Sequence, residues 1–199
     1  QAFPPMCPDA VIRWEPDRAH YLGNVLRLSA GGRVVVFNAR DGEWSATIEV
    51  LRRDRGAIRL VHMDRPPSVT QGPGIMFAPL KRDATEMIIR MGTELGVECF
   101  YPVITERTNT HRLNEGRLSA IAREASEQCE RLDVPAIAPI RPMMEAIAHA
   151  PTDMQLFVAL ERLDPTAQES EVPRACPGDA LLIGPEGGFS PREQDFLRG

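Results

Sequence analysis

The stretch Leu181-Leu182-Ile183-Gly184-Pro185-Glu186-Gly187-Gly188-Phe189-Ser190-Pro191-Arg192-Glu193 decides how the second part of this chain is interpreted. Its apolar start is typical of a buried strand, which leads into a Gly-Pro-Glu-Gly-Gly loop. Ser190, Pro191 and Glu193 then form a capping box, which predicts that a helix begins here. Glycines have no Cβ atom, so the loop backbone can lie flush against a ligand. A plain strand-to-helix turn with a solvated Glu186 has the same pattern and stays open as an alternative.

Alternating strand and helix patterns surround this loop from residue 75 onward. The predicted strands are 75–79, 97–103, 136–140, 155–160 and 180–183, and the predicted helices are 83–95, 115–132 and 142–149. Such alternation predicts a parallel sheet with helices on both faces. Ligands of these sheets bind beyond the carboxyl ends of the strands, which is where the glycine-rich loop lies.

Apolar spacing defines one face of each of the two longer helices. The helix over 83–95 begins at the capping-box pattern Asp83-x-x-Glu86 and ends at Gly96. Its apolar face consists of Met87, Ile88, Met91 and Leu95. The helix over 115–132 turns a second set inward: Leu118, Ile121, Ala122, Ala125 and Cys129.

Residues 1–65 show a period of two instead. Runs at 33–37, 44–50 and 58–62, separated by turn residues, predict consecutive antiparallel strands. The alternating sets are Trp44, Ala46, Ile48 and Val50 in one run, and Ile58, Leu60 and His62 in the next. With a short helix over 20–28, this part is predicted to be a small β-barrel. Residues 66–74 hold three Pro and two Gly and are predicted to be a linker to the domain at 75–199.

Composition and charge narrow the class of protein. The 199 residues are 43% hydrophobic and 26% charged, which excludes a disordered or fibrous chain. The apolar runs are too short for a membrane span, so we expect a soluble, cytoplasmic protein. Residues 1–65 carry a net charge of +2 and the remainder −7, so any RNA contact must come from local patches. The scattered cysteines and histidines predict reduced, partly buried thiols and no metal site.

Short motifs, taken in order along the chain, resemble one family. They are His20–Leu28 followed by Gly31, then Lys81, Glu94-Leu95-Gly96, Thr105-Glu106-Arg107, Glu124–Arg131 and the Gly-Pro-Glu-Gly-Gly loop. Together they resemble the ribosomal RNA small subunit methyltransferase E family, of the SPOUT class of knotted methyltransferases. The resemblance covers essentially the whole chain. It implies an α/β fold in which a SPOUT-type knotted parallel-sheet methyltransferase domain follows a small PUA-like β-barrel that binds RNA.

The sequence departs from the family pattern in two places. Gly32 stands where the family commonly has an acidic residue. The family also continues beyond the helix at Ser190 into a segment that closes the knot and the cofactor pocket, whereas this sequence ends at Gly199. We therefore expect the C-terminal knot segment to be missing from the printed sequence.

The activity that the resemblance implies is methyl transfer from S-adenosylmethionine to N3 of a specific uridine in 16S rRNA of the small ribosomal subunit. The implied cofactor-binding residues are Leu160, Glu161, Ile183, Gly184, Pro185, Glu186, Gly187 and Gly188. Glu161 is equally well explained as a surface acid before a turn. The candidate catalytic residues are Gln128, Arg131 and Glu186, and the general base stays open between Glu127, Glu161 and Glu186.

RNA contacts are expected from arginine and lysine residues in both parts of the chain. The candidates are Arg13, Arg27, Lys81, Arg82, Arg123 and Arg131, with Arg52, Arg53 and Arg55 as a further N-terminal group. Gln128 and Arg131 are three residues apart, which places them on one face of the predicted helix, although such a polar face is usually only solvated.

Assembly and the alternative functions complete these expectations. SPOUT relatives work as dimers, so the resemblance implies a homodimer formed through the α/β domain. The alternatives are a non-catalytic PUA-like RNA-binding protein, a SPOUT methyltransferase acting on another RNA, and an α/β enzyme that uses another adenine cofactor. Titration with the cofactor separates an enzyme from a binding protein.

Overall fold

The computed structural model describes residues 5–14, 28–52, 55–160 and 174–198. The chain divides into two compact units, Gln1–Val69 and Thr70–Gly199. The division falls inside the stretch 66–74 that the sequence predicts as a linker. Each unit has its own core, and each is described here by itself.

The first unit contains a four-stranded antiparallel sheet with the strand order β1-β4-β3-β2. Its strands are β1 (Val11–Trp14), β2 (Arg33–Asn38), β3 (Gly42–Arg52) and β4 (Arg55–Arg65). The three consecutive strands β2, β3 and β4 confirm the pattern predicted from the period of two. The predicted short helix over 20–28 falls outside the described residues, except for Leu28.

The core of this sheet follows the predicted alternation only part of the way. Trp44, Ala46 and Ile48 are buried against Ile58 and Leu60 of the neighbouring strand. Val50 and His62 continue the same alternation in the sequence, but both are exposed. The pairing of β3 with β4 has register shifts between Glu43 and Trp44, Ser45 and Ala46, and Ile48 and Val50. A bulge changes the face to which the following side chains point, so the predicted alternation, which put Val50 with Ile48 and His62 with Leu60, was wrong for these two residues.

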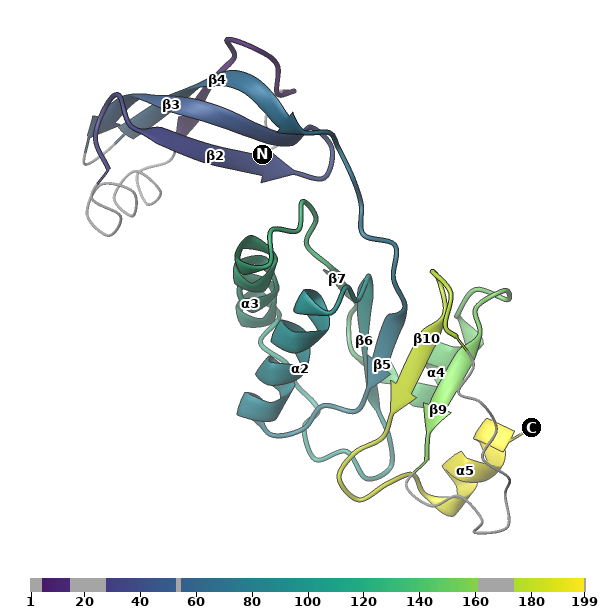
Figure 1. Cartoon of the computed structure of the whole chain (residues 1–199). Coiled ribbons are helices and arrows are strands. Elements are labelled where there is room, and N and C mark those ends of the chain that lie inside the picture. The colour runs from purple at the N-terminus through teal and green to yellow at the C-terminus, as the bar shows by residue number, and fades with distance from the viewer. Residues whose placement is uncertain (1–4, 15–27, 53–54, 161–173, 199) are drawn as a thin grey trace. The chain divides into compact units, whose positions relative to one another are not determined.

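The second unit contains a parallel sheet with the strand order β7-β6-β5-β10-β9, and β8 pairs with β6 as well. Its strands are β5 (Gly74–Phe77), β6 (Cys99–Ile104), β7 (Ala136–Ile137), β8 (Arg141–Pro142), β9 (Leu156–Ala159) and β10 (Ala180–Ile183). Every recorded pairing is parallel, which confirms the predicted sheet type. The last strand, β10, lies between β5 and β9, so the loop after it is flanked by the ends of earlier strands (Figure 1).

Helices cover both faces of this sheet. They are α2 (Arg82–Glu94), α3 (Glu115–Gln128), α4 (Met143–Ala148) and α5 (Pro191–Arg198). Neighbouring residues of a strand point to opposite faces, and β5 shows this directly. Phe77 packs into a core with Ile89 of α2 and Leu118 of α3, whereas Met76 packs with Met143 of α4. Figure 1 shows α2 and α3 together on one side of the sheet.

The inward face of α2 differs from the sequence prediction. Its buried residues are Thr85, Ile89, Gly92 and Thr93. Met87, Met91 and Leu95 are 59%, 50% and 80% exposed, so the face that they form does not pack on the sheet. The small residues Gly92 and Thr93 allow the opposite side of the helix to lie close to the strands: a Cβ atom at Gly92 would come within 2.7 Å of the Phe100 ring.

The predicted capping box at the start of α2 was also wrong. The N-cap residue is Lys81, which forms no capping hydrogen bond with its side chain. The hydroxyl of Thr85 instead accepts from the Leu80 N–H and donates to the Leu80 carbonyl oxygen, at 3.1 and 3.2 Å. The Glu86 carboxylate binds arginines, as described below, and is therefore not available as a cap.

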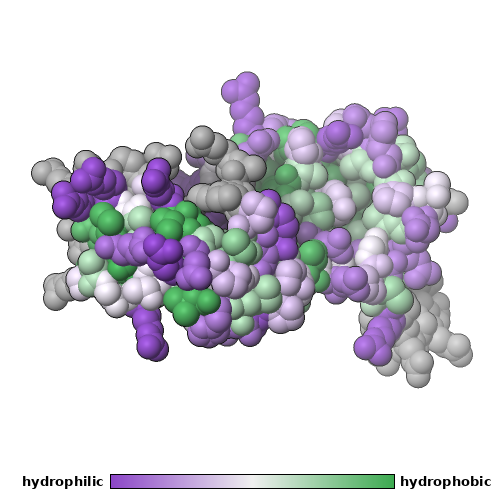
Figure 2. All heavy atoms as spheres, turned by 90° about the horizontal axis from the view of Figure 1, so that it is seen from above, coloured by the Kyte–Doolittle hydropathy of each residue, from purple (hydrophilic) through white to green (hydrophobic). Residues whose placement is uncertain are grey.

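The surface carries hydrophobic residues among hydrophilic ones on the face seen in Figure 2. Among the described helices, none is long and apolar enough to cross a membrane. All four cysteines lie among the described residues as free thiols; Cys99 is half-buried, and the other three are exposed. Burial raises the pKa of the Cys99 thiol, and this favours its neutral form.

Candidate functional site

A hollow of about 730 Å³ opens at the carboxyl ends of β9 and β10. Seven of the eight residues predicted to bind the cofactor line it: Leu160, Ile183, Gly184, Pro185, Glu186, Gly187 and Gly188. The eighth, Glu161, lies outside the described residues. The same hollow is lined by residues that were not predicted to bind the cofactor: Leu80, Arg107, Ala159, Phe189, Gln194 and Arg198. The fold thus gathers the ends of β5, β6, β9 and β10 around one cavity.

The glycine-rich loop owes its tight path to two of its glycines. Gly188 has a φ of +67°, in the left-handed region that residues with a Cβ atom rarely adopt, and its N–H donates to the Pro185 carbonyl oxygen at 2.8 Å. A Cβ atom at Gly184 would lie 2.9 Å from the Phe189 ring. Phe189 is buried in the core beneath the loop. The loop is therefore folded back on its own anchor, with its backbone facing the hollow.

The helix that follows the loop begins as the sequence predicts. The Ser190 hydroxyl accepts from the Glu193 N–H at 3.2 Å, and the Glu193 carboxylate accepts from the Ser190 N–H at 2.8 Å. This reciprocal pair is the predicted capping box and is confirmed. The other carboxylate oxygen of Glu193 accepts from the Glu106 N–H at 2.8 Å, a contact that the sequence did not indicate.

Arg107 connects the turn after β6 to the glycine-rich loop. Its Nη1 donates to the carbonyl oxygen of Gly187 at 2.6 Å. The turn itself is closed by the Thr108 hydroxyl, which accepts from the Thr105 N–H at 2.9 Å. Arg107 lies in the Thr105-Glu106-Arg107 motif, in the turn after the predicted strand 97–103, and that position is the signal that would have placed it at the site.

The charges of the hollow are few. Among its described lining residues, the ionised side chains are Arg107, Arg198 and Glu186. Gln194 adds an amide, which donates to the Phe189 carbonyl oxygen at 3.0 Å, and the others offer apolar surface or backbone groups. Glu186 is exposed, in the middle of the loop. A concave site that combines apolar side chains with backbone and side-chain polar groups suits a small ligand with both apolar and polar parts.

A positively charged region borders the hollow at the start of α2. Leu80 lines the hollow, and the next residue, Lys81, is exposed. Arg82 is also exposed, but it contacts Glu86 at 2.9 Å. Arg117, at the start of α3, contacts both oxygens of the same carboxylate, with Nη2 at 2.7 Å from Oε2. These hydrogen bonds, from Arg117 first and then Arg82, lower the pKa of Glu86 to about 2.

Gln128 and Arg131 lie at the other edge of the sheet, away from the hollow. Helix α3 ends at Gln128, and Glu130 adopts a φ of +58°, so Arg131 lies beyond the helix. Its N–H donates to the Ser126 carbonyl oxygen, which completes a helix stop of the Schellman type. The predicted helix to residue 132, and with it the shared helical face of these two residues, was wrong. The expected inward position of Cys129 was wrong for the same reason, since it is the C-cap residue.

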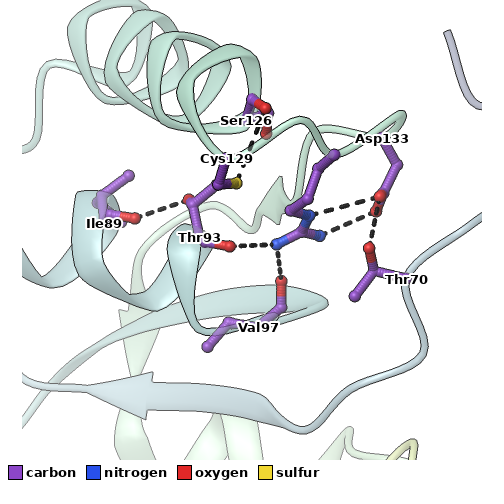
Figure 3. Close-up of polar contacts among 8 residues, drawn as sticks. Thr70, Ile89, Thr93, Val97, Ser126, Cys129 and Asp133 are labelled. Carbon is purple, nitrogen blue, oxygen red and sulfur yellow. Dashed lines mark hydrogen bonds and ion pairs between the residues drawn. The ribbon is translucent and has the colours of Figure 1, made fainter. Parts of the chain in front are cut away.

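The Arg131 side chain is 8% exposed, and its guanidinium has structural partners (Figure 3). Its Nη1 donates to the carbonyl oxygens of Thr93 and Val97, at 2.7 and 3.0 Å, and its Nη2 donates to Asp133 at 2.9 Å. Burial of Asp133 would raise its pKa, but the hydrogen bonds from Arg131 and Thr70 outweigh burial and lower it. Arg131 thus joins the end of α2, the turn before β6 and, through Asp133, Thr70 at the start of the second unit.

The remaining predicted RNA contacts are dispersed. Arg13 is exposed on β1 of the first unit, and Arg123 is exposed on α3 of the second. Gln128 is exposed at the last position of α3. Arg27 and Arg53 lie outside the described residues. Within the described ranges, no group of three or more histidine, cysteine or acidic residues is arranged to hold a metal ion.

The protein is of the two-unit α/β class. A parallel sheet with helices on both faces is joined to an antiparallel unit, and its glycine-rich loop borders a hollow at the carboxyl edge, where ligands of such sheets bind. The profile of the RNA methyltransferase domain matches residues 71–199, and that of the RNA methyltransferase PUA domain matches residues 15–61. The chain belongs to the RNA methyltransferase family.

Individual relatives agree with this assignment. The chain is 27% identical to the ribosomal RNA small subunit methyltransferase E of Rickettsia conorii, over 89% of this chain and 73% of that protein. It is 30% identical to the protein of the same name from Synechocystis, over 93% of this chain and 62% of that protein. Both comparisons run through both units.

Solved structures show the same fold. A putative methyltransferase of Legionella pneumophila in complex with the bound cofactor SAM superposes with a TM-score of 0.78 at 27% identity, covering 96% of this chain and 81% of that chain. The ribosomal RNA small subunit methyltransferase E of Neisseria gonorrhoeae, bound to S-adenosyl methionine, has a TM-score of 0.79 at 23% identity, covering 96% and 80%. At 23% identity, the comparison with the Neisseria protein shows a common fold and no more.

Proposed function

We propose that this protein transfers a methyl group from S-adenosylmethionine to N3 of a uridine in 16S rRNA of the small ribosomal subunit. The observation that carries the proposal is the hollow of about 730 Å³ that seven residues predicted from sequence line together, in a chain of the RNA methyltransferase family. Relatives named ribosomal RNA small subunit methyltransferase E support the choice of RNA. That substrate would place the activity in the cytoplasm.

The residues present fit S-adenosylmethionine. The volume of the hollow lies within the range of about 300–1,000 Å³ that small-molecule sites occupy. Leu160, Ile183 and Pro185 offer apolar walls, and the loop offers backbone groups without side chains at Gly187 and Gly188. When bound, the cofactor supplies a methyl group that its sulfonium activates. A cation of this kind tolerates the nearby carboxylate of Glu186.

The chain's own residues then have two tasks. N3 of uridine carries a proton at neutral pH, which must leave as the new N–C bond forms. Among the described lining residues Glu186 is the carboxylate, so we propose that it accepts this proton. We expect Lys81 and Arg82, exposed beside Leu80, to bind an RNA phosphate next to the target nucleotide. Alignment of the reactants then provides the remaining catalysis.

The test is a methylation assay with labelled S-adenosylmethionine and small subunits, or free 16S rRNA, that lack the modification. Digestion to nucleosides and mass spectrometry should reveal 3-methyluridine, and Glu186→Gln should lower kcat about 100-fold. Labelled product in a different RNA would support the alternative substrate. RNA binding without any binding of S-adenosylmethionine would overturn the proposal in favour of a non-catalytic RNA-binding protein.

We also propose that two copies pair through the α/β unit. The support is the apolar, exposed face formed by Met87 and Met91 of α2 and by its C-cap residue Leu95, which are spaced four residues apart. Exposed apolar faces of this kind mark interaction surfaces, and two-fold dimers are the commonest oligomers.

A further inference from the structure

The Glu193 carboxylate does more than cap its own helix. It is 3% exposed, and both of its oxygens accept hydrogen bonds from backbone N–H groups, those of Ser190 and Glu106, each at 2.8 Å. The bond to Ser190 belongs to the capping box. The bond to Glu106, 87 residues away in the sequence, is not required to start a helix. A buried carboxylate that accepts such charge-assisted bonds holds its donors firmly.

The donor at Glu106 belongs to a closed turn. The Thr105 N–H donates to the Thr108 hydroxyl at 2.9 Å, the two threonine hydroxyls lie 2.8 Å apart, and the Thr108 N–H donates to the Thr105 carbonyl oxygen at 3.1 Å. Thr105 and Thr108 are both buried. The turn is therefore rigid within itself, and Glu193 fixes its tip against the start of α5. Arg107 projects from that tip.

Arg107 carries this restraint to the glycine-rich loop. Its Nη1 donates to the Gly187 carbonyl oxygen at 2.6 Å, and a Cβ atom at Gly187 would lie 3.5 Å from the Arg107 Cδ. The far end of the loop is held from the core side by Phe189. The loop is thus pinned on two sides: by an apolar anchor from below and by a guanidinium from the turn after β6.

We infer that Arg107 is a positioning residue for the loop 184–188, and that Glu193 holds Arg107 in place through the turn 105–108. A loop that is fixed before its ligand arrives loses less conformational entropy on binding, so the ligand binds more tightly. The inference deepens the proposed function and rests on it for the identity of the ligand, which is S-adenosylmethionine. The restraint on the loop itself is a property of the protein without any ligand.

The first test needs no cofactor. Hydrogen exchange of the Gly188 amide, which donates to Pro185 within the loop, is followed in the full chain and in Arg107→Ala. Loss of one hydrogen bond from a charged group should speed exchange about tenfold, with the thermal midpoint unchanged because Arg107 is exposed. Arg107→Lys, which keeps a donor, should restore part of the protection. Arg192→Ala, an exposed arginine on the first turn of α5, is the matched control and should change nothing.

The second test examines the coupling to Glu193. Glu193→Gln replaces one acceptor with a donor and should speed the same exchange, whereas Glu106→Gln should not, because only the backbone of Glu106 is bound. In the double variant of Arg107→Ala and Glu193→Gln the effects on loop exchange should not add, since both changes release the same contact. Equal exchange in Arg107→Ala and the unchanged protein, or additive effects in the double variant, would overturn the inference.

The link to function is measured by calorimetric titration with S-adenosylmethionine. Arg107→Ala should weaken binding about tenfold, with KM for the cofactor raised and kcat little changed. If the unchanged protein does not bind S-adenosylmethionine, the proposed function is refuted. The hydrogen-exchange results would still show whether Arg107 positions the loop. Unaltered cofactor affinity in Arg107→Ala, with the loop loosened, would overturn the role of that positioning in binding.

Discussion

Single residues at the glycine-rich loop show how backbone conformation determines what can lie there. The left-handed φ of Gly188 and the closeness of Gly184 to the Phe189 ring both disfavour a side chain for steric reasons. Arg131 illustrates the opposite case, in which a charged residue that resembles an RNA contact is committed to Thr93, Val97 and Asp133. The chemistry of a residue type is therefore realised only by the partners that the fold gives it.

Gly188→Ala tests the loop with a close control. Both Gly188 and Gly178 have positive φ, +67° and +91°, and an alanine at either position should cost about 1–2 kcal/mol of stability. Only Gly188 lines the hollow. We therefore expect Gly188→Ala to weaken binding of S-adenosylmethionine at least tenfold and Gly178→Ala to leave it unchanged, as measured by calorimetry alongside thermal unfolding. Similar cofactor affinity in the two variants would show that the hollow is not the cofactor site.

At the scale of elements, α2 and α3 are joined at their N-terminal ends by one carboxylate. Glu86 receives Arg82 from its own helix and Arg117 from the neighbouring one. This arrangement keeps two arginines side by side next to Lys81, at the edge of the hollow where RNA is proposed to bind. The same bridge explains why Glu86 does not serve in the capping box that the sequence predicts.

The pKa of Glu86 reports this bridge directly. Since the folded-state pKa is lowered from 4.5 to about 2, the stabilisation is present above about pH 4.5 and is lost as the pH falls toward about 2. Arg117→Ala removes the largest cause, so the pKa of Glu86 should rise toward its ordinary value in a carboxyl NMR titration. Arg90→Ala, an exposed arginine on the same helix, is the control. If the pKa of Glu86 stays near 2 in Arg117→Ala, the bridge is refuted.

At the scale of the whole molecule, the exposed apolar face of Met87, Met91 and Leu95 predicts that two chains associate. Light scattering of the protein at micromolar concentration should give the mass of two chains. Met91→Glu places a charge in the centre of the apolar face and should yield single chains, because burial of an unpaired carboxylate opposes association. Val61→Glu, at a similarly exposed apolar residue of the first unit, should stay dimeric. A single-chain mass for the unchanged protein would exclude the dimer.

The sequence by itself determined what depends on neighbours along the chain. Period-two alternation predicted β3 and β4, strand–helix alternation predicted the parallel sheet, and the spacing of Ser190 and Glu193 predicted the start of α5. The glycine-rich loop followed from the same reasoning, since it comes directly after a predicted strand, whereas its assignment to the cofactor, with that of Leu160, came from the resemblance to the methyltransferase family. Local pattern suffices here because turn chemistry, capping and side-chain alternation act over a few residues.

Only the tertiary structure decided features that depend on contacts between distant segments. Helix α2 packs on the sheet through the side that bears Ile89, Gly92 and Thr93, because Gly92 lets the helix lie close to the Phe100 ring. The methionine side chains of α2 lie on the exposed side. The bulges between β3 and β4 turned Val50 and His62 outward. Arg107 reached Gly187, Glu193 reached Glu106, and Arg131 was withdrawn from the surface by carbonyl groups more than 30 residues away. Sequence spacing carries no information about such partners, because the free energy that selects them comes from close packing and from satisfying buried polar groups in three dimensions.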